Sequence, residues 1–320
     1  MPSRTPDYPV PLFRLACMNS PELHHLECTS AAGGHRMGYW QWGDPRAGSM
    51  VVCVHGLTRL GRDFDVLARE LLQRAGAQGQ TLRVVCPDVP GRGSSDWLSD
   101  PALYQPATYL ANLQALLAHL HRQVPITVLD WVGTSMGGLI GMLAAATPQM
   151  LPRPIGRLVL NDVGPRLNWA GLARIKTYVG QGGPFDSLEA GVAALRTTLV
   201  GFGPHTEAQW HALNAPMFKP TAGGRWVFHY DPAIAGPFAQ LTEASNQQAG
   251  DLMQAVYERI SAHTLLLRGA ESELLTREAA AAMTQCGPRA RLIEFAGVGH
   301  APTLVTGEQL APVLDFLLPR

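Results

Sequence analysis

Short apolar runs alternate with helical patterns along most of the chain. Six runs of four or five residues are rich in Val, Leu and Ile, which is typical of strands buried in a sheet. Several segments between them repeat their apolar residues every three or four positions, as amphipathic helices do. The expected strands are residues 51–54, 82–86, 126–129, 157–160, 263–267 and 291–295. The expected helices are residues 64–72, 109–120 and 276–285, with a further one that ends near residue 146.

This alternation of strands and helices predicts a largely parallel sheet with helices on both faces. Between residues 163 and 262 the alternation stops, and the pattern is mostly helical with glycine-rich breaks. This part of the chain holds 11 of the 23 aromatic residues. We therefore expect a helical cap at residues 163–262, inserted into a core formed by residues 23–162 and 263–320. Residues 1–22 are rich in proline and are expected to form an N-terminal arm.

Composition narrows the function classes. The 320-residue chain has 25 Lys and Arg residues against 25 Asp and Glu residues, so it carries no basic excess for binding nucleic acid. Hydrophobic residues make up 46% of it, but no apolar run is long enough for a membrane span or a signal peptide. The 5 cysteines form no C-x-x-C pair, and no cluster has the spacing of a metal site. We therefore expect a cytoplasmic globular protein with no metal, cofactor, membrane or nucleic-acid partner.

One glycine-rich segment has the context of a catalytic elbow. Residues 133–138, Gly-Thr-Ser-Met-Gly-Gly, match G-x-S-x-G and lie between a predicted strand and a predicted helix. Glycines on both sides of Ser135 allow a sharp turn and a close approach of neighbouring backbones. Such a turn exposes the serine hydroxyl beside the free N–H groups of a helix N-terminus. The pattern favours Ser135 as a nucleophile over a packing turn with an incidental serine.

A serine hydroxyl needs a base to take its proton, and His300 is the best placed of the 11 histidines. It lies in a glycine-flanked loop directly after the last predicted strand, at residues 291–295. Because the carboxyl ends of parallel strands meet at one sheet edge, we expect its imidazole near Ser135.

The base needs a carboxylate that holds its tautomer and stabilises the imidazolium. Glu273 is the preferred candidate, because it follows the strand at residues 263–267 and gives the chain order serine, acid, histidine. Asp162 follows the strand before the cap and offers a rival geometry. Glu271 is the third candidate, and each of the three carboxylates has the alternative role of a helix cap.

The loop His55-Gly56-Leu57 follows the predicted strand at residues 51–54. In sheets of this kind, the oxyanion hole combines the amide after the nucleophile with one amide from this loop. This rule nominates the backbone N–H groups of Met136 and Leu57. His55 itself is expected to brace the turn by hydrogen bonding rather than to take part in chemistry.

Arg59 lies just beyond this loop. A guanidinium at this position suits a carboxylate on a substrate. Asp63 and Asp88 offer nearby carboxylates, and an ion pair with one of them is the favoured interpretation. Arg59 is therefore left out of the predicted site.

Together these motifs resemble the α/β-hydrolase superfamily over about residues 23–318. The resemblance rests on His55-Gly56, residues 87–95, residues 133–138, residues 269–273 and Gly299-His300. It implies an α/β fold with a mostly parallel eight-stranded sheet, helices on both faces and a helical cap after strand 6. It also implies a Ser–acid–His triad that works through an acyl-enzyme. The family acid is more often Asp than Glu, so Glu273 departs from the common pattern.

The predicted function is a serine hydrolase that cleaves carboxylic esters without a cofactor. In this interpretation Ser135 attacks the carbonyl, His300 transfers the proton and Glu273 orients the imidazole. Most of the aromatic residues of the cap are expected to form the insertion's own small core, but their number, with few charges beside them, predicts a mainly apolar pocket for small to medium substrates. These residues are Trp169, Trp210, Phe218, Trp226 and Phe228. A lactonase, a carbon–carbon bond hydrolase, a hydroxyalkanoate-oligomer hydrolase and a slow-turnover small-molecule receptor remain alternatives with the same residues.

Overall fold

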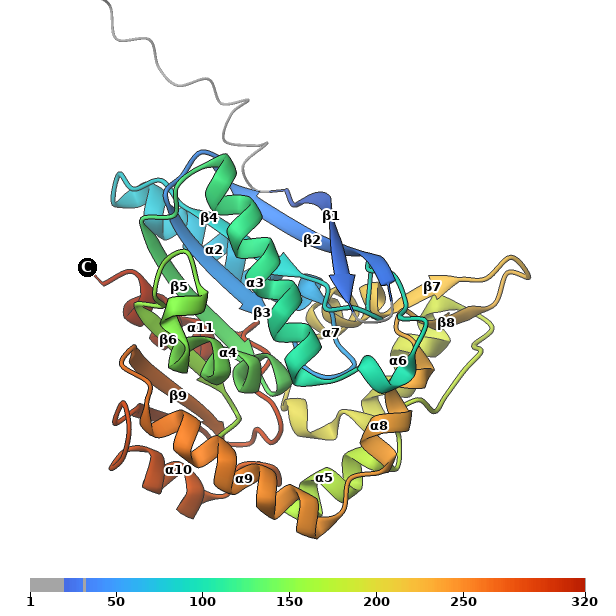
Figure 1. The fold of residues 1–320 in the computed structure, drawn as a ribbon. Coiled ribbons are helices and arrows are strands. Elements are labelled where there is room, and N and C mark those ends of the chain that lie inside the picture. Colours follow the sequence, from blue (N-terminus) through green and yellow to red (C-terminus); the bar gives the residue numbers. More distant parts are fainter. Residues whose placement is uncertain (1–19, 31–32, 320) are drawn as a thin grey trace, which may run out of the picture.

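The computed structural model describes residues 20–30 and 33–319, so most of the expected N-terminal arm lies outside the described residues. An eight-stranded sheet has the order β1-β2-β4-β3-β5-β6-β9-β10 (Figure 1). The pairs β1–β2 and β2–β4 are antiparallel, and all other neighbours are parallel. The strands are β1 (Glu22–Ser30), β2 (Gly33–Gly43), β3 (Ser49–Val54), β4 (Arg83–Pro87), β5 (Val128–Thr134), β6 (Arg157–Asn161), β9 (His263–Gly269) and β10 (Arg291–Phe295). The predicted mostly parallel eight-stranded sheet is confirmed.

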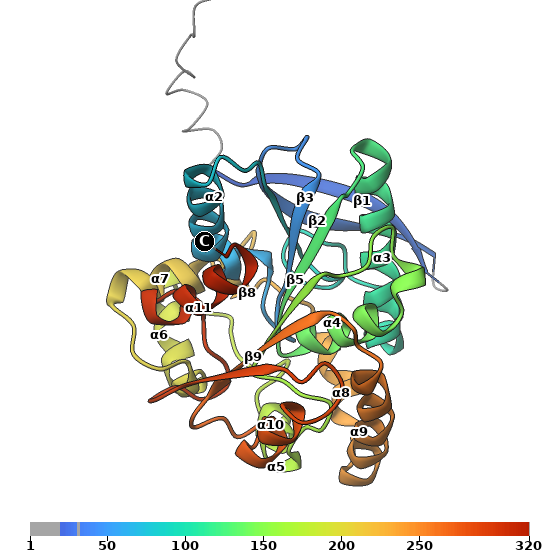
Figure 2. The same ribbon diagram turned by 90° about the vertical axis from the view of Figure 1, so that its left-hand side faces the viewer.

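Helices cover both faces of this sheet (Figure 2). The helices α2 (Asp65–Ala77) and α11 (Gly307–Leu317) pack on one face, and α3 (Pro106–Gln123) and α4 (Met136–Ala146) pack on the other. The alternation of side chains in β3 explains why this strand is apolar throughout, since Val51 and Cys53 face α2 whereas Met50, Val52 and Val54 face the opposite core. The short helix α10 (Arg277–Met283) connects β9 to β10.

The strand β5 differs from its predicted bounds. We expected it at residues 126–129, but it begins at Val128 and continues to Thr134. The buried Asp130 lies inside it, and its Oδ1 accepts a hydrogen bond from the backbone N–H of Arg157 at 2.8 Å. Because this carboxylate has a partner across the sheet, a charged residue is accommodated where the sequence pattern predicted the end of the strand.

Residues 163–262, which we call the inserted segment, lie between β6 and β9. Figure 1 shows the first part of this segment beyond the carboxyl ends of the parallel strands. The expected helices are present, but a two-stranded hairpin that the pattern did not predict lies among them. The helices are α5 (Trp169–Lys176), α6 (Leu188–Thr198), α7 (Glu207–Asn214), α8 (Ala235–Ala239) and α9 (Glu243–Glu258). The hairpin pairs β7 (Phe218–Pro220) with β8 (Trp226–Phe228).

Candidate active site

Ser135 occupies the single residue between the end of β5 and the start of α4. Its backbone has φ 51° and ψ −117°, a conformation that costs a side-chain-bearing residue free energy. The turn is also crowded, because a Cβ on Gly137 would collide with the carbonyl oxygen of Val54. The glycine therefore permits the close approach between the loop after β3 and the start of α4, and the sharp turn projects the serine hydroxyl away from the sheet.

A continuous chain of hydrogen bonds joins Ser135, His300 and Asp162. His300 Nε2 lies 2.9 Å from Ser135 Oγ, and His300 Nδ1 lies 2.7 Å from Asp162 Oδ2. Because the Asp162 carboxylate can only accept a hydrogen bond, Nδ1 of His300 carries the proton. Nε2 of His300 is then free to accept a hydrogen bond from the Ser135 hydroxyl. The geometry is that of a nucleophile, a base and a carboxylate that orients the base.

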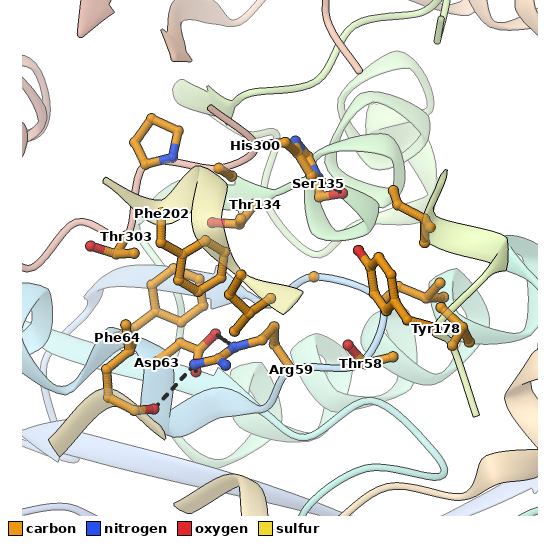
Figure 3. Close-up of a pocket in the computed structure, with 18 residues that line it drawn as sticks. Thr58, Arg59, Asp63, Phe64, Thr134, Ser135, Tyr178, Phe202, His300 and Thr303 are labelled. Carbon is orange, nitrogen blue, oxygen red and sulfur yellow. Dashed lines mark hydrogen bonds and ion pairs between the residues drawn. The ribbon is translucent and has the colours of Figure 1, made fainter. Parts of the chain in front are cut away.

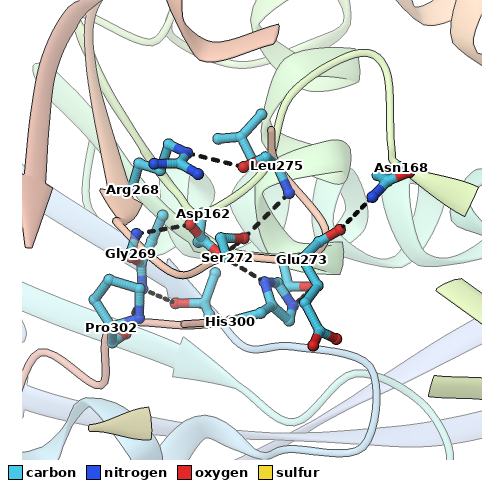
Figure 4. A network of polar contacts seen from close by, with 12 residues as sticks. Asp162, Asn168, Arg268, Gly269, Ser272, Glu273, Leu275, His300 and Pro302 are labelled. Atoms are coloured by element: carbon cyan, nitrogen blue, oxygen red, sulfur yellow. Dashed lines mark hydrogen bonds and ion pairs between the residues drawn. The ribbon is translucent and has the colours of Figure 1, made fainter. Parts of the chain in front are cut away.

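Asp162 is held firmly in this position. It is 0% exposed, and the chain reaches it directly from the end of β6. Its Oδ1 accepts a hydrogen bond from the Gly269 amide at 2.9 Å, and its Oδ2 accepts one from the Ser272 hydroxyl at 2.6 Å (Figure 4). The backbone N–H of Asp162 also donates to the carbonyl of Leu267 at 2.8 Å. Burial of a carboxylate is costly unless it is fully hydrogen-bonded, and these partners satisfy it.

The expected contact between Glu273 and His300 is corrected by these distances. The Glu273 side chain is 57% exposed and forms an ion pair with Arg174 of α5, with 2.5 Å between Oε2 and Nε. Glu271 is also exposed. The loop after β9 turns so that Ser272 faces inward, which directs both glutamates outward. Asp162, the rival candidate from the sequence, lies where Glu273 was expected.

The two amides nominated for the oxyanion hole belong to Met136, which follows Ser135 in the chain, and to Leu57, which lines the same cavity as Ser135. Among the hydrogen bonds of the described residues, neither the Leu57 amide nor the Met136 amide donates to a protein acceptor. The His55 ring fixes the Leu57 amide, because its Nδ1 donates to the carbonyl of Gly56 at 2.7 Å. That carbonyl and the Leu57 N–H belong to one trans peptide group, so they point in opposite directions. Both amides are therefore available to a ligand.

His55 is a bracing residue, as the sequence analysis expected. Its Nε2 accepts a hydrogen bond from the Val89 amide at 3.0 Å, and the ring is completely buried. Burial lowers the pKa of His55 to about 3, assisted by the positive charges of Arg92 and Arg59. The ring stays neutral and ties the loop after β3 to the loop after β4.

A cavity of about 710 Å³, measured with its open mouth, has Ser135 and His300 in its wall (Figure 3). The rest of the wall is mainly apolar. Its apolar side chains from the core and the inserted segment include Phe64, Ile175, Val179, Leu199, Phe202 and Leu213.

Most aromatic side chains of the inserted segment lie outside this wall. A second, smaller hollow adjoins the cavity beside Ser135. None of the five aromatic residues considered in the sequence analysis lines the cavity, and among them Phe228 alone lines the smaller hollow. The five are Trp169, Trp210, Phe218, Trp226 and Phe228. Phe218 and Phe228 instead stack with their ring centroids 5.0 Å apart, and Tyr230 stacks on Phe228 at 5.4 Å. These rings form a small core of the inserted segment itself.

Arg59 connects the core to the inserted segment. Its Nε and one terminal nitrogen donate to the Asp63 carboxylate at 2.7 Å each, which is one of the two ion pairs that the sequence suggested. The other terminal nitrogen donates to Oδ1 of the buried Asn214 at 2.9 Å. A backbone carbonyl, that of Leu213, accepts a further bond at 3.1 Å. The guanidinium is thus engaged by protein groups on both sides of the cavity.

Within residues 20–30 and 33–319, no group of three His, Cys, Asp or Glu side chains is placed to hold a metal ion. In the same part of the chain, every helix is too short or too polar to cross a lipid bilayer.

Comparison with known proteins identifies a family to which the chain is similar and several similar proteins. Residues 51–313 match the model of the alpha/beta hydrolase family. The chain is 43% identical over 300 residues to the 3-hydroxybutyrate-oligomer hydrolase of Cupriavidus necator, covering 93% of this chain and 98% of that protein. An alpha/beta hydrolase structure from Novosphingobium aromaticivorans has 34% identity and a TM-score of 0.76, covering 94% of this chain and 99% of that one. A protein from Rickettsia typhi has 26% identity and a TM-score of 0.80, covering 93% and 99%.

Proposed function

The chain belongs to the alpha/beta hydrolase family, and we propose that it is a serine hydrolase that cleaves the ester bonds of short 3-hydroxybutyrate oligomers. The observation that carries the chemistry is the hydrogen-bonded chain from Ser135 through His300 to the buried Asp162. The observation that favours the substrate is the 43% identity to a 3-hydroxybutyrate-oligomer hydrolase along nearly its whole length.

The mechanism follows from the positions of these three side chains. Ser135 Oγ attacks the ester carbonyl while His300 Nε2 takes its proton, and Asp162 stabilises the imidazolium that forms. His300 then protonates the departing alcohol, which leaves an acyl group on Ser135. In the second half of the reaction a water molecule gives its proton to His300 and attacks the acyl carbonyl, which releases the acid and restores the serine.

The oxyanion of each tetrahedral intermediate needs donors that are fixed before the reaction starts. The Leu57 and Met136 amides fill this role, since neither has a protein acceptor among the described residues. Donors of this kind act strongly because no reorganisation is needed as the charge develops. Asp162 takes the place that the sequence had given to Glu273.

The cavity suits the ester-linked part of such an oligomer, which is uncharged; the only charge of the oligomer is its terminal carboxylate. The cavity wall is largely apolar, and the charges of Arg59 and Asp63 neutralise each other. A 3-hydroxybutyrate oligomer presents methyl groups and ester oxygens in alternation, which matches an apolar wall that carries a few hydroxyls. The same wall favours a second candidate function, a general hydrolase of short carboxylic esters.

The test is turnover by the purified protein on the dimer and trimer of 3-hydroxybutyrate, followed by chromatography of the monomer released. We expect many turnovers per molecule, and a higher kcat/KM on p-nitrophenyl butyrate than on p-nitrophenyl laurate. Turnover of the butyrate ester without turnover of either oligomer would replace the proposed function with the general short-chain hydrolase. Binding of both without repeated turnover would indicate a receptor.

A further inference from the structure

A second, smaller hollow adjoins the cavity beside Ser135. Four residues line both spaces and therefore form the junction between them: Thr58, Arg59, Tyr178 and Leu199. The second hollow extends from this junction into the inserted segment, where Gln181, Leu195 and Phe228 belong to its wall. A substrate longer than one acyl unit would pass through the junction.

Tyr178 projects its phenol into this junction. Figure 3 shows its hydroxyl directed to the side of the cavity where Ser135 and His300 lie. Tyr178 follows the end of α5, and its ring is packed near the Arg174 guanidinium, 6.0 Å from the ring centroid. Within the described part of the chain, no protein group forms a hydrogen bond with its hydroxyl. The phenol of Tyr230 differs, since it accepts a hydrogen bond from the Gly180 amide at 3.2 Å.

The other groups at the junction show what kind of ligand the phenol suits. The Arg59 guanidinium is occupied by Asp63, Asn214 and a backbone carbonyl, so it offers no free cation for a carboxylate. The Thr58 hydroxyl, like that of Tyr178, has no protein partner among the residues that the structure describes. Burial raises the pKa of Tyr178, which keeps the phenol protonated as a donor. Two neutral hydroxyls on an apolar wall suit a neutral oxygen atom.

We propose that Tyr178, together with Thr58, binds the oxygen on the third carbon of the acyl unit that Ser135 attacks, and so selects 3-hydroxyacyl esters over simple alkanoyl esters. This inference rests on the proposed function and adds to it the residues that recognise the acyl group. In a dimer that oxygen is a free hydroxyl, and in a longer oligomer cleaved at an inner ester bond it is the ester oxygen that leads to the next unit. The next unit then continues into the second hollow. Tyr178 is a specificity residue here and takes no part in proton transfer.

A matched pair of substrates tests the contact between Tyr178 and the oxygen on the third carbon of the acyl unit. p-Nitrophenyl 3-hydroxybutyrate and p-nitrophenyl butyrate share a leaving group and differ only by the oxygen in question. Removal of one neutral hydrogen bond in Tyr178→Phe is expected to lower kcat/KM on the hydroxy ester by roughly threefold to tenfold, mainly through KM. The same change should therefore lower the ratio of kcat/KM on the hydroxy ester to kcat/KM on the butyrate ester by roughly threefold to tenfold, and Thr58→Val should shift this ratio in the same direction.

The control is Tyr257→Phe, which removes the same atom at a site outside both spaces. The Tyr257 hydroxyl donates to the carbonyl of Met283 at 2.8 Å, so this change should affect stability and leave the ratio of the two esters unchanged. Equal effects of Tyr178→Phe on the two esters, or no effect on either, would overturn the inference while ester hydrolysis stands. Absence of wild-type turnover on both esters would overturn the proposed function and this inference with it.

Discussion

Asp162 and His300 lie 138 positions apart in the chain and meet with 2.7 Å between Oδ2 and Nδ1. Asp162 is the first residue after β6 and has φ 56°, so the chain turns sharply as it leaves the sheet. The same carboxylate accepts a hydrogen bond from the backbone N–H of Gly269, which lies at the end of β9, the strand beside β6. The Asp162 carboxylate is therefore held at the carboxyl ends of two neighbouring strands of the sheet.

Asp162→Asn is predicted to abolish most of the activity while the protein stays folded. Without the carboxylate, the imidazole is free to adopt the tautomer with its proton on Nε2, which cannot accept from Ser135. Comparable changes in other triads lower kcat by about 10⁴-fold. The measurement is kcat on p-nitrophenyl butyrate at neutral pH, with a thermal melt to verify folding.

Glu273→Gln is the matched control, because it removes a carboxylate from the neighbouring loop. The Glu273 carboxylate forms an ion pair with the partly exposed Arg174, and exposed ion pairs contribute about 1 kcal/mol or less to stability. We expect kcat within about threefold of wild type. A loss of activity in Glu273→Gln with an active Asp162→Asn would return the acid to Glu273.

His55 predicts a specific dependence of stability on pH. The folded state keeps this ring neutral down to about pH 3, whereas the unfolded chain binds a proton below its ordinary pKa of 6.5. As the pH falls from 6.5 toward 3, the unfolded state gains a proton that the folded state lacks, so the free energy of unfolding decreases. Between pH 8 and pH 5 the contribution of His55 to this decrease is about 2 kcal/mol.

His55→Gln keeps a donor and an acceptor at this position but cannot be protonated. Its unfolding free energy, from urea titrations at pH 8 and pH 5, should therefore decrease less than that of the wild type by about 2 kcal/mol. All other titrating groups are common to both proteins and cancel in the difference. Equal decreases in the two proteins would show that His55 is not held neutral by the fold.

Asn214→Ala is predicted to weaken the link between the core and the inserted segment. Asn214 is completely buried, where it accepts from Arg59 and donates to the carbonyl of Trp210 at 2.9 Å. Its removal leaves a buried guanidinium nitrogen without its partner, which costs about 1–3 kcal/mol. We expect this loss in urea unfolding and an increased KM, since Arg59 and Leu213 line the cavity.

The control for this substitution is Asn168→Ala. The Asn168 side chain donates one hydrogen bond, to the carbonyl of Glu273 at 2.9 Å, at an exposed position. Its removal should cost less than about 1 kcal/mol, because water replaces the lost partner. If Asn214→Ala is no more destabilising than Asn168→Ala, the link through Arg59 does not hold the segment.

The sequence predicted Ser135 and His300 as partners because each lies in a glycine-flanked turn or loop directly after a predicted strand. The carboxylate that contacts His300 has no such local sequence pattern. Asp162 and Glu273 both follow strands of the sheet, and which one faces inward depends on how each loop turns. Ser272 turns inward and Glu273 outward, and residue types alone do not determine this. The structure was needed to choose between the two carboxylates.

Other differences have similar physical origins. The strand β1 was not predicted at its position, because an edge strand with solvent on one side carries polar residues such as His24 and His25. The hairpin of β7 and β8 consists of strands of three residues, too short for a period to be recognised. The number of aromatic residues in the inserted segment does not distinguish pocket lining from a core of the segment itself. Phe218 and Phe228 pack against other aromatic rings, as in the second of these arrangements.

The central claim is that Ser135 carries the acyl group during hydrolysis of 3-hydroxybutyrate oligomers. The most direct measurement mixes the wild-type protein with the trimer, quenches with acid within milliseconds and determines the mass of the peptide that contains Ser135. We predict one 3-hydroxybutyryl group, or a short oligomer of it, on that serine. The group should be absent from a folded Ser135→Ala variant whose kcat is lower by about 10⁴-fold or more. An acyl group on another residue, or more than about a tenth of wild-type activity in Ser135→Ala, would contradict the account.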